Sequence, residues 1–423
     1  MVRLVVIADD FTGALDTGIQ FHAKDSEVFV CNDREKSIKE KLAGDLQVLI
    51  VDAETRHLKA EEAYRIIYRI AKLASEMGVP YLYKKTDSGL RGNIGSELTA
   101  FLDASTEEAV HFFPAFPKMG RITRNGVHFI DGVPVAESVF GKDPFEPVLR
   151  SSVKEIIEGQ SRVPVSLCGT EPAEQGTEGI CVYDSATDDD MFRLGCLLKE
   201  QGRLHLMAGC AGFAAVLFRL LGLAVEEETD PCFPGGLLTI CGSISAVTAG
   251  QLDHASGHGM KRVVLTPEQK LSEGWIDSEE GSRSIAVWKD TLRAEQCLII
   301  ECGVHDLERT TVYIKENGLT QEEARKRISG AMGGILKRML DAGADATLLV
   351  TGGDTLLAFM QEIGVDTLVP LCEMAPGVVL SKLSYRGRSY RLLSKSGGFG
   401  QEDILIRLAD RVGQNTGIQA REA

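Results

Sequence analysis

The chain has 423 residues, with 46 Lys and Arg against 61 Asp and Glu and a formal net charge of −15. This length exceeds one ordinary hydrophobic core, so we expect two domains. The acidic balance opposes binding to a nucleic-acid backbone or to an anionic membrane surface. Ten cysteines are scattered without a Cys-x-x-Cys pair, which is typical of reduced thiols in a cytoplasmic protein.

Neither of the two main apolar segments predicts insertion into a membrane. The first apolar run stops at Asp9 and Asp10 after a few residues, which does not fit a secretory leader. The longest run, Leu206 to Val225, contains Arg219 and a Gly-Cys-Ala-Gly turn. It therefore predicts a buried helix and no membrane span.

The first half of the chain predicts alternating strands and helices. Apolar runs predict strands at 4–7, 27–30, 47–51, 81–83, 109–113 and 179–184. We expect a short helix over 17–23, and the helical spacing of apolar residues predicts another over about 60–77, stopped by Gly78. This alternation is typical of an α/β fold with a mainly parallel sheet and helices on both faces.

Two turn signals, Asn125-Gly126 and Asp131-Gly132, interrupt this alternation. Both are flanked by apolar residues, which predicts a small β-hairpin insertion over 121–135. Further along, the charged segment 226–231 ends in proline and predicts an exposed linker. We therefore place one domain at 1–228 and a second at 235–423.

The second half repeats the scheme of strands that end in polar turns. Strands are expected at 237–241, 298–300 and 347–350, with helices from about 247, over 320–340 behind a Thr-x-x-Glu capping box, and from about 403. Three glycine-containing turns follow apparent strands at 242–245, 351–355 and 395–400. Backbone N–H groups in such turns bind phosphate, because glycine lets the main chain approach the anion.

Two common nucleotide motifs are missing from the sequence. No G-x-x-x-x-G-K-[ST] loop occurs, and no G-x-G-x-x-G follows the first strand. This argues against a standard P-loop ATPase and against a dinucleotide-dependent dehydrogenase. The eight histidines show no metal-ligand spacing, so we interpret them as structural.

The strand ends of the first half place acids beside cations. A polyol acid needs Arg or Lys for its carboxylate and Asp for its hydroxyls. Each such charge, taken alone, is more often a solvated or structural charge. The candidates for the carboxylate are Arg56, Lys85 and Arg91, and those for a general base toward an attacking hydroxyl are Asp9, Asp10 and Asp87.

Phosphoryl transfer to that hydroxyl would depend on positioning and on charge neutralisation, usually with Mg²⁺ bridging the phosphates. Asp354 is one possible acid on the metal side of such a site. Its structural alternative is a turn residue that caps the next helix. The sequence does not identify the metal ligands.

Several motifs, in order, resemble the four-carbon acid sugar kinase family over nearly the whole chain. They are Ile7–Ala14, Lys85–Asn93, Phe113–Pro117, Thr123–Gly126, Asp143–Pro144, Gly242–Ser245, Gly352–Thr355 and Lys395–Gly400. The resemblance implies an N-terminal α/β domain that binds the acid sugar, a C-terminal α/β domain that binds ATP, and a cleft between them. It also implies ATP-dependent phosphorylation of the C4 hydroxyl of a tetronic acid.

Carried over by position, the resemblance implies which residues contact each ligand. The acid-sugar contacts would be Asp9, Arg56, Lys85, Thr86, Asp87 and Ser88. The nucleotide contacts would be Ser243, Gly352, Gly353, Asp354, Thr355, Gly397, Gly398, Phe399 and Gly400. We add Asp10, Arg91 and Ser245 from spacing and chemistry, and we take Asp87 and Asp10 as the catalytic candidates.

The substrate within the family is harder to assign, because D-threonate, D-erythronate and 3-oxo-tetronate differ by one stereocentre or one oxidation level. The run Ala14–Gly18 resembles the threonate and erythronate kinases more than the 3-oxo-tetronate kinases. A 3-oxo-tetronate 4-kinase is one alternative, and a non-catalytic acid-sugar sensor is another. The expected partners are the acid sugar and ATP, and a homodimer is compatible with the family.

Overall fold

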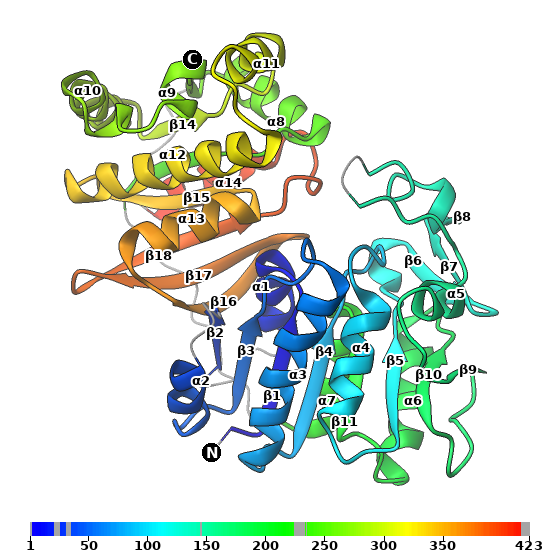
Figure 1. Cartoon of the computed structure of the whole chain (residues 1–423). Helices are drawn as coiled ribbons and strands as arrows, with labels where there is room; N and C mark the ends of the chain where they lie inside the picture. Colours follow the sequence, from blue (N-terminus) through cyan, green and yellow to red (C-terminus); the bar gives the residue numbers. More distant parts are fainter. Residues whose placement is uncertain are drawn as a thin grey trace. The chain divides into compact units, whose positions relative to one another are not determined.

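The computed structural model describes residues 2–20, 26–30, 35–143, 146–223, 233 and 235–415. The chain forms two compact units, Met1–Glu227 and Glu228–Ala423, which we call the N-terminal and C-terminal units (Figure 1). The linker predicted over 226–231 lies outside the described residues. Within the described ranges, no helix is long and apolar enough to cross a membrane.

The N-terminal unit contains a parallel sheet with the strand order β2-β3-β1-β4-β11-β5-β10-β9. The strands are β1 (Leu4–Ala8), β2 (Ser26–Val30), β3 (Val48–Asp52), β4 (Tyr81–Lys85), β5 (Ala109–Phe113), β9 (Val165–Gly169), β10 (Gly179–Tyr183) and β11 (Leu206–Gly209). β1, β3 and β5 are buried at every position, as expected for strands covered on both faces. The predicted parallel sheet is confirmed.

Two groups of helices cover this sheet (Figure 1). One group packs α1 (Phe11–Gln20) and α6 (Asp188–Glu200) against α7 (Ala211–Leu221). In the other group, α3 (Ala60–Glu76) packs against α2 (Glu35–Leu42) and α4 (Ile94–Asp103), and α5 (Val153–Glu158) packs against α4. The prediction of one helix across the apolar stretch from Leu206 is wrong at its start, because the first four residues form β11.

The helix predicted over 17–23 begins earlier than expected, at Phe11. Its first turn is capped by Asp10, whose Oδ1 accepts a hydrogen bond from the Gly13 N–H over 3.0 Å. Asp and Asn are favoured at this position because they satisfy a free N–H of the first turn. Residues 21–23 of the prediction lie outside the described residues.

The predicted insertion is a small antiparallel sheet of β6 (Arg121–Arg124), β7 (Val127–Ile130) and β8 (Val133–Pro134). Asn125 and Asp131 have φ values of 51° and 49°, and the glycines that follow them also have positive φ. Positive φ at both central residues is the geometry of tight hairpin turns. The two turn signals are confirmed, and the second adds a third strand to the expected hairpin.

The C-terminal unit contains the strand order β13-β14-β12-β15-β18-β17-β16. The strands are β12 (Gly236–Cys241), β13 (Lys261–Val264), β14 (Cys297–Glu301), β15 (Ala346–Thr351), β16 (Thr367–Ala375), β17 (Val378–Tyr385) and β18 (Arg388–Lys395). The first five in spatial order are parallel, whereas β16, β17 and β18 form an antiparallel meander. This meander was not predicted, so the sheet is less uniformly parallel than expected.

The helices of this unit also form two groups (Figure 1). α12 (Gln321–Asp341) packs on α13 (Gly353–Ile363), α9 (Pro267–Leu271) and α10 (Glu279–Glu295), and α11 (Leu307–Glu316) packs on α9. α8 (Ala246–Gly257) packs on α14 (Ile404–Asn415). The predicted capping box is confirmed, since Thr320 and Glu323 exchange the expected side-chain to backbone bonds at the start of α12.

Substitutions at two neighbouring glycines of α12 can test how closely this helix packs on α13. A Cβ at Gly333 would come within 2.6 Å of the backbone nitrogen of Phe359, whereas a Cβ at Gly334 would meet nothing within 4 Å. Gly333→Ala should destabilise the C-terminal unit by about 1–3 kcal/mol through this overlap. Gly334→Ala should stabilise it by about 0.5–1 kcal/mol, because alanine favours the helix.

Differential scanning calorimetry of both variants would measure these shifts. Gly334→Ala serves as the matched control, since it makes the same chemical change one residue away. Equal and favourable shifts for both variants would contradict the close backbone contact.

Candidate functional site

The predicted acid-sugar residues follow three adjacent strands of the N-terminal unit. Ala8, Asp52 and Lys85, at the ends of β1, β3 and β4, are paired in register. The chain leaves β1 toward β2 on one side and leaves β4 toward β5 on the other. This edge is therefore a topological switch point, where open α/β sheets bind their ligands.

Arg56 lies at the centre of a buried ion cluster at this edge. Its Nε donates to Asp9 Oδ2 over 2.8 Å, and its Nη1 donates to Asp10 Oδ2 over 2.7 Å. Its Nη2 lies 3.6 Å from Asp87 Oδ1. Burial raises the pKa of Asp9, but the charges of Arg56 and Lys85 outweigh burial and lower this pKa to about 2. Asp9 is therefore an ionised hydrogen-bond acceptor at neutral pH.

Asp87 is held by the loop that follows it. Arg91 donates from Nε to Asp87 Oδ2 over 2.9 Å and from Nη2 to Oδ1 over 3.1 Å. The Gly89 N–H also donates to Oδ2, over 3.2 Å. Burial raises the pKa of Asp87, but the charges of Arg91 and Arg56 outweigh burial and hold the pKa well below its usual value. In this arrangement Asp87 is a well-oriented carboxylate of low basicity.

Each cation that the sequence offers for a substrate carboxylate already lies close to a protein acid. Besides Asp87, Arg91 binds Asp143, with Nη1 donating to Oδ2 over 3.1 Å. Lys85 Nζ lies 3.8 Å from Asp9 Oδ1. A ligand carboxylate would share these cations with the protein's own acids.

Several buried oxygen atoms in this part of the described chain have no hydrogen-bond partner, among them Asp9 Oδ1, Asp52 Oδ2, Thr55 Oγ1 and Thr86 Oγ1. Beside them, Lys85 Nζ and Asp10 Oδ1 pack closely on Gly13, where a Cβ would overlap both atoms. Buried polar atoms are rarely left without a partner in folded proteins. Of these atoms, Asp9 Oδ1 and Thr86 Oγ1 belong to predicted acid-sugar contacts, so they are the best candidates for contacts with ligand hydroxyls.

The contacts of the Asp10 carboxylate differ from those expected of a general base. Its carboxylate accepts from the Thr12 hydroxyl over 2.9 Å, in addition to the Gly13 N–H and the Arg56 guanidinium. These contacts make Asp10 the cap of α1 and a partner of Arg56. They occupy three acceptor positions of its carboxylate.

The small antiparallel sheet supports the loop that carries Ser88. Arg121 donates to the Ser88 hydroxyl, and His128 Nε2 lies 3.0 Å from the Ser88 carbonyl oxygen. The Phe140 ring lies 5.1 Å from the guanidinium carbons of both Arg91 and Arg121. Sequence reasoning missed these supports, because the turn signals indicate the sheet but not which distant loop it contacts.

The predicted nucleotide residues also follow adjacent parallel strands, in the C-terminal unit. Cys241, Thr351 and Lys395, at the ends of β12, β15 and β18, are paired in register. The chain leaves β12 toward β13 on one side and leaves β15 toward the meander on the other. The three glycine-containing turns thus meet at the switch point of this second sheet.

Ser245 joins the first of these turns to the third. Its Oγ donates to the Gly397 carbonyl over 2.6 Å and accepts from the Thr248 N–H over 3.1 Å, which caps α8. Thr248 Oγ1 donates to the same carbonyl over 2.8 Å. A Cβ at Gly397 would come within 2.3 Å of Ser243 Oγ. The close approach of these two turns therefore requires glycine at position 397.

The second turn begins α13. Gly352 precedes the helix with a φ of 105°, which favours glycine. The backbone N–H groups of Gly353 and Thr355 lie in the first helical turn, where N–H groups lack intrahelical partners and can bind anions. Asp354 is not the N-cap, which is Gly352, but the second residue of the helix, and its Oδ2 lies 3.5 Å from Arg325 Nη1.

Gln251 holds the third turn in place. Its Nε2 donates to the carbonyls of Phe399, Gly400 and Gln401 over 3.0, 2.8 and 3.1 Å. A Cβ at Gly398 would meet no atom within 4 Å, so the turn is open at this point. Across the described residues, no group of three or more His, Cys, Asp or Glu side chains is placed to hold a metal ion.

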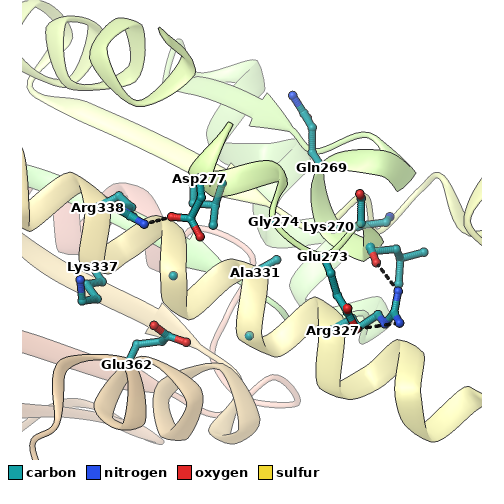
Figure 2. A pocket seen from close by; sticks show the side chains of 15 residues that line it. Gln269, Lys270, Glu273, Gly274, Asp277, Arg327, Ala331, Lys337, Arg338 and Glu362 are labelled. Carbon is teal, nitrogen blue, oxygen red and sulfur yellow. Dashed lines mark hydrogen bonds and ion pairs between the residues drawn. The ribbon is translucent and has the colours of Figure 1, made fainter. Parts of the chain in front are cut away.

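A separate cavity of about 310 Å³ lies in the C-terminal unit beside α12, away from the three turns (Figure 2). Its wall contains α9, part of α12 and the short 3₁₀ helix η3 (Trp275–Asp277). Arg327 pairs with Glu273 over 2.8 Å, and Arg338 pairs with Asp277. Because these guanidinium groups already have acidic partners, the cavity offers a weaker anion site than the turns do.

The buried position of His128, which contacts the Ser88 carbonyl, can be tested through the pH dependence of the protein's stability. Burial lowers the pKa of His128 to about 4, whereas an unfolded histidine titrates near about 6.5. Between these values the unfolded chain binds a proton that the folded chain does not, so stability should fall as the pH is lowered from about 6.5 to 4. His128→Gln, which keeps an amide donor for Ser88, should reduce this pH dependence.

Urea unfolding of the variant and of the unchanged protein between pH 4 and 7 would measure the slope of the free energy of unfolding against pH. His205→Gln is the control, because His205 is exposed and also bonds to a backbone carbonyl, that of Pro80. A slope that stays the same in His128→Gln would contradict a buried neutral imidazole.

The comparisons with known proteins extend over both units. The chain matches the protein family described as a sugar-binding N-terminal domain over residues 4–217 and the one described as a nucleotide-binding C-terminal domain over residues 238–405. It is 27% identical to a D-threonate kinase of Salmonella typhimurium, over 96% of this chain and 97% of the relative. It is 25% identical to a 3-oxo-tetronate kinase of Pseudomonas fluorescens, over 98% of this chain and 97% of the relative.

A crystal structure of a Haemophilus influenzae protein has the same fold. It superposes with a TM-score of 0.70 at 20% identity and covers 97% of this chain and 99% of that protein. The two matched domains coincide with the units that carry the acid-and-cation cluster and the three glycine-containing turns. The chain belongs to the four-carbon acid sugar kinase family.

Proposed function

We propose that this protein transfers the terminal phosphoryl group of ATP to the 4-hydroxyl of D-threonate or D-erythronate. The observation that carries the proposal is the buried cluster at the ends of β1, β3 and β4, where acceptor atoms for hydroxyls lie beside cations. The relative that acts on D-threonate and the run Ala14–Gly18 favour these two acids. The relative that acts on 3-oxo-tetronate keeps that acid as the alternative substrate.

On the sugar side, Asp9 and Thr86 would accept hydrogen bonds from substrate hydroxyls through their free oxygen atoms. Arg56, Lys85 and Arg91 would supply positive charge to the carboxylate while remaining bound to protein acids. Ser88 would add a hydroxyl that accepts from Arg121, while His128 holds the Ser88 carbonyl oxygen. Such a set of fixed polar groups orients a small polar ligand.

Asp87 and Asp10 are the two proposed catalytic carboxylates, and their contacts favour one of them over the other. Asp87 is the stronger candidate, because its contacts fix its orientation and leave it ionised. Phosphoryl transfer passes through a loose transition state, so a carboxylate that orients the attacking hydroxyl needs little basicity. Asp10 would act chiefly by holding Arg56 and α1 in place.

On the nucleotide side, the N–H groups of the three turns fit the phosphates of ATP. We propose the contacts at Ser243, Ser245, Gly352, Gly353, Thr355, Gly397, Gly398, Phe399 and Gly400. Mg²⁺ would supply charge neutralisation on the phosphates, and it needs only one or two carboxylates because it keeps most of its waters. Asp354 is the proposed protein ligand, since it is the acid in the first turn of α13.

The direct test is a coupled ADP-release assay with Mg-ATP and a panel of D-threonate, D-erythronate, L-threonate and 3-oxo-tetronate. We expect release with D-threonate or D-erythronate at a kcat/KM well above that for the other acids. Turnover only with 3-oxo-tetronate would move the assignment to the alternative substrate. Binding of an acid without any ADP release or ATP binding would favour a sensor over a kinase.

Thr86→Val tests the proposed contact with a substrate hydroxyl. Valine has the same shape and removes a buried hydroxyl that has no partner, so the fold should be as stable or more stable. KM for the acid sugar should rise about 10-fold or more, as expected when a hydrogen bond to a ligand is lost.

Thr239→Val is the matched control, because Thr239 is also fully buried with a hydroxyl that has no partner, inside β12. It should share the effect on thermal stability and leave KM for the acid sugar unchanged. An unchanged KM in Thr86→Val would remove Thr86 from the proposed site.

A further inference from the structure

Lys395 is a buried cation at the beginning of the third glycine-containing turn. It is the last residue of β18, and only 1% of it is exposed. Its Nζ donates to the carbonyl oxygen of Ser396 over 3.1 Å. Among the described residues, no carboxylate acts on its charge. The positive charge is thus held inside the unit with only a backbone dipole to stabilise it.

Several other buried or partly buried cations have acidic partners. Lys270, which is also buried in the C-terminal unit, donates to the carbonyl of Cys302 but is influenced by the negative charges of Asp306 and Glu301. Lys84, which is fully buried in the N-terminal unit, lies 2.8 Å from Glu97 Oε2. In the C-terminal unit, Arg262 Nη2 lies 3.0 Å from Glu301 Oε1. The guanidinium groups of the cavity in Figure 2 are also paired. Lys395 differs from these cations because no carboxylate among the described residues acts on its charge.

The surroundings of Lys395 contain few charges. β15, β17 and α13 pack against β18, and their titratable residues are Lys382, Tyr385, Asp354 and Glu362. Burial lowers the pKa of Lys395 to about 8, and the one charge effect on it comes from the Cys241 thiol. Burial raises the pKa of that thiol to about 12, so it is neutral at physiological pH.

The position of Lys395 points to an anion. In the strand register, Lys395 is paired with Thr351, which is paired in turn with Cys241. Thr351 and Cys241 lead into the other two turns. Its own carbonyl accepts from the Gly352 N–H over 3.1 Å, which ties β18 to the start of α13. An anion held by the turns would supply the countercharge that the protein does not provide.

We propose that Lys395 binds a phosphate group of the nucleotide through its ammonium group and is the principal protein cation of that site. This inference rests on the proposed nucleotide site and adds a residue to it. A bound phosphate favours the protonated lysine, so nucleotide binding should be accompanied by proton uptake near pH 8. At pH 6.5 the lysine is already protonated, so the uptake should disappear.

Calorimetric titration of the unchanged full-length protein with ADP, in buffers of different ionisation enthalpy, measures this uptake. We expect up to about half a proton per bound nucleotide at pH 8, since half of the lysine is then neutral before binding. Affinity should fall as the pH rises above about 8. Binding without proton uptake at pH 8 would overturn the inference.

Lys395→Met provides a second measurement that does not depend on titration. Methionine fills the same space without a charge, so the variant should unfold at the same or a higher temperature without nucleotide. Its affinity for ADP at pH 7 should fall about 10- to 100-fold, the effect of losing a charged hydrogen bond. The proton uptake at pH 8 should also be lost.

Lys382→Met is the matched control, because Lys382 is an exposed lysine on the neighbouring strand β17. It makes the same change in net charge and should leave ADP affinity and proton uptake unchanged. If Lys395→Met is folded and binds ADP as tightly as the unchanged protein, the inference fails while the nucleotide site stands. If the unchanged protein binds no ADP, the proposed nucleotide site fails, and the role of Lys395 fails with it.

Discussion

The sugar-binding unit depends on one buried guanidinium, that of Arg56. Asp9, Asp10 and Asp87 come from two strand ends and would repel one another if they were ionised together without a cation. Arg56 reaches all three from the end of a third strand. Its planar fork can hold several carboxylate oxygens in fixed directions, which a lysine could not do.

This arrangement has a cost and a benefit. Burying charges is unfavourable unless the geometry is good and the remaining hydrogen-bond positions are filled. The cluster meets most of that demand, since Asp10 and Asp87 also accept backbone N–H groups. The benefit is rigidity, because each polar group is oriented before a ligand arrives.

Both units use the same position in the fold to assemble polar groups. In each, the residues of interest follow parallel strands on either side of the point where the strand order reverses. Glycine is required where chain segments converge there. A Cβ at Gly13 would overlap Lys85, and one at Gly242 would overlap the hydroxyl of Thr355 at 1.9 Å. Close approach of backbone and side chain, not loop flexibility, explains these glycines.

The sequence allowed the strand-end residues to be predicted because they adjoin recognisable apolar runs. It also predicted the parallel sheet of the first unit, the small insertion and the helix behind the capping box. It could not show that Arg56 contacts Asp9 and Asp10, because these contacts span 47 and 46 residues and leave no periodic signal. The sequence therefore leaves open whether these cations are structural or available to a substrate, and the structure shows that they lie beside protein acids.

The remaining errors have similar causes. Strands β16 and β17 were missed because the alternation within this meander is weak, with β16 only partly buried along its length. The start of α1 differs from the prediction because Asp10 caps a helix whose first turn, Phe11-Thr12-Gly13-Ala14, contains a glycine and a β-branched residue, both weak helix formers. Lys395 was noticed only as part of a motif, since the absence of a countercharge is visible only in three dimensions.

The two units also show a contrast in how charge is balanced. In the sugar-binding unit the cations are matched by acids of the protein, so a ligand gains most from the free acceptor atoms and from displacing water. Recognition then falls mainly on hydroxyl groups, and a site that hydrogen-bonds a hydroxyl can discriminate strongly against an analogue that lacks it. In the nucleotide-binding unit Lys395 is unmatched, so an anion gains from its charge directly. The first unit is thus suited to select a ligand by the placement of its hydroxyls, and the second to bind one by its phosphate charge.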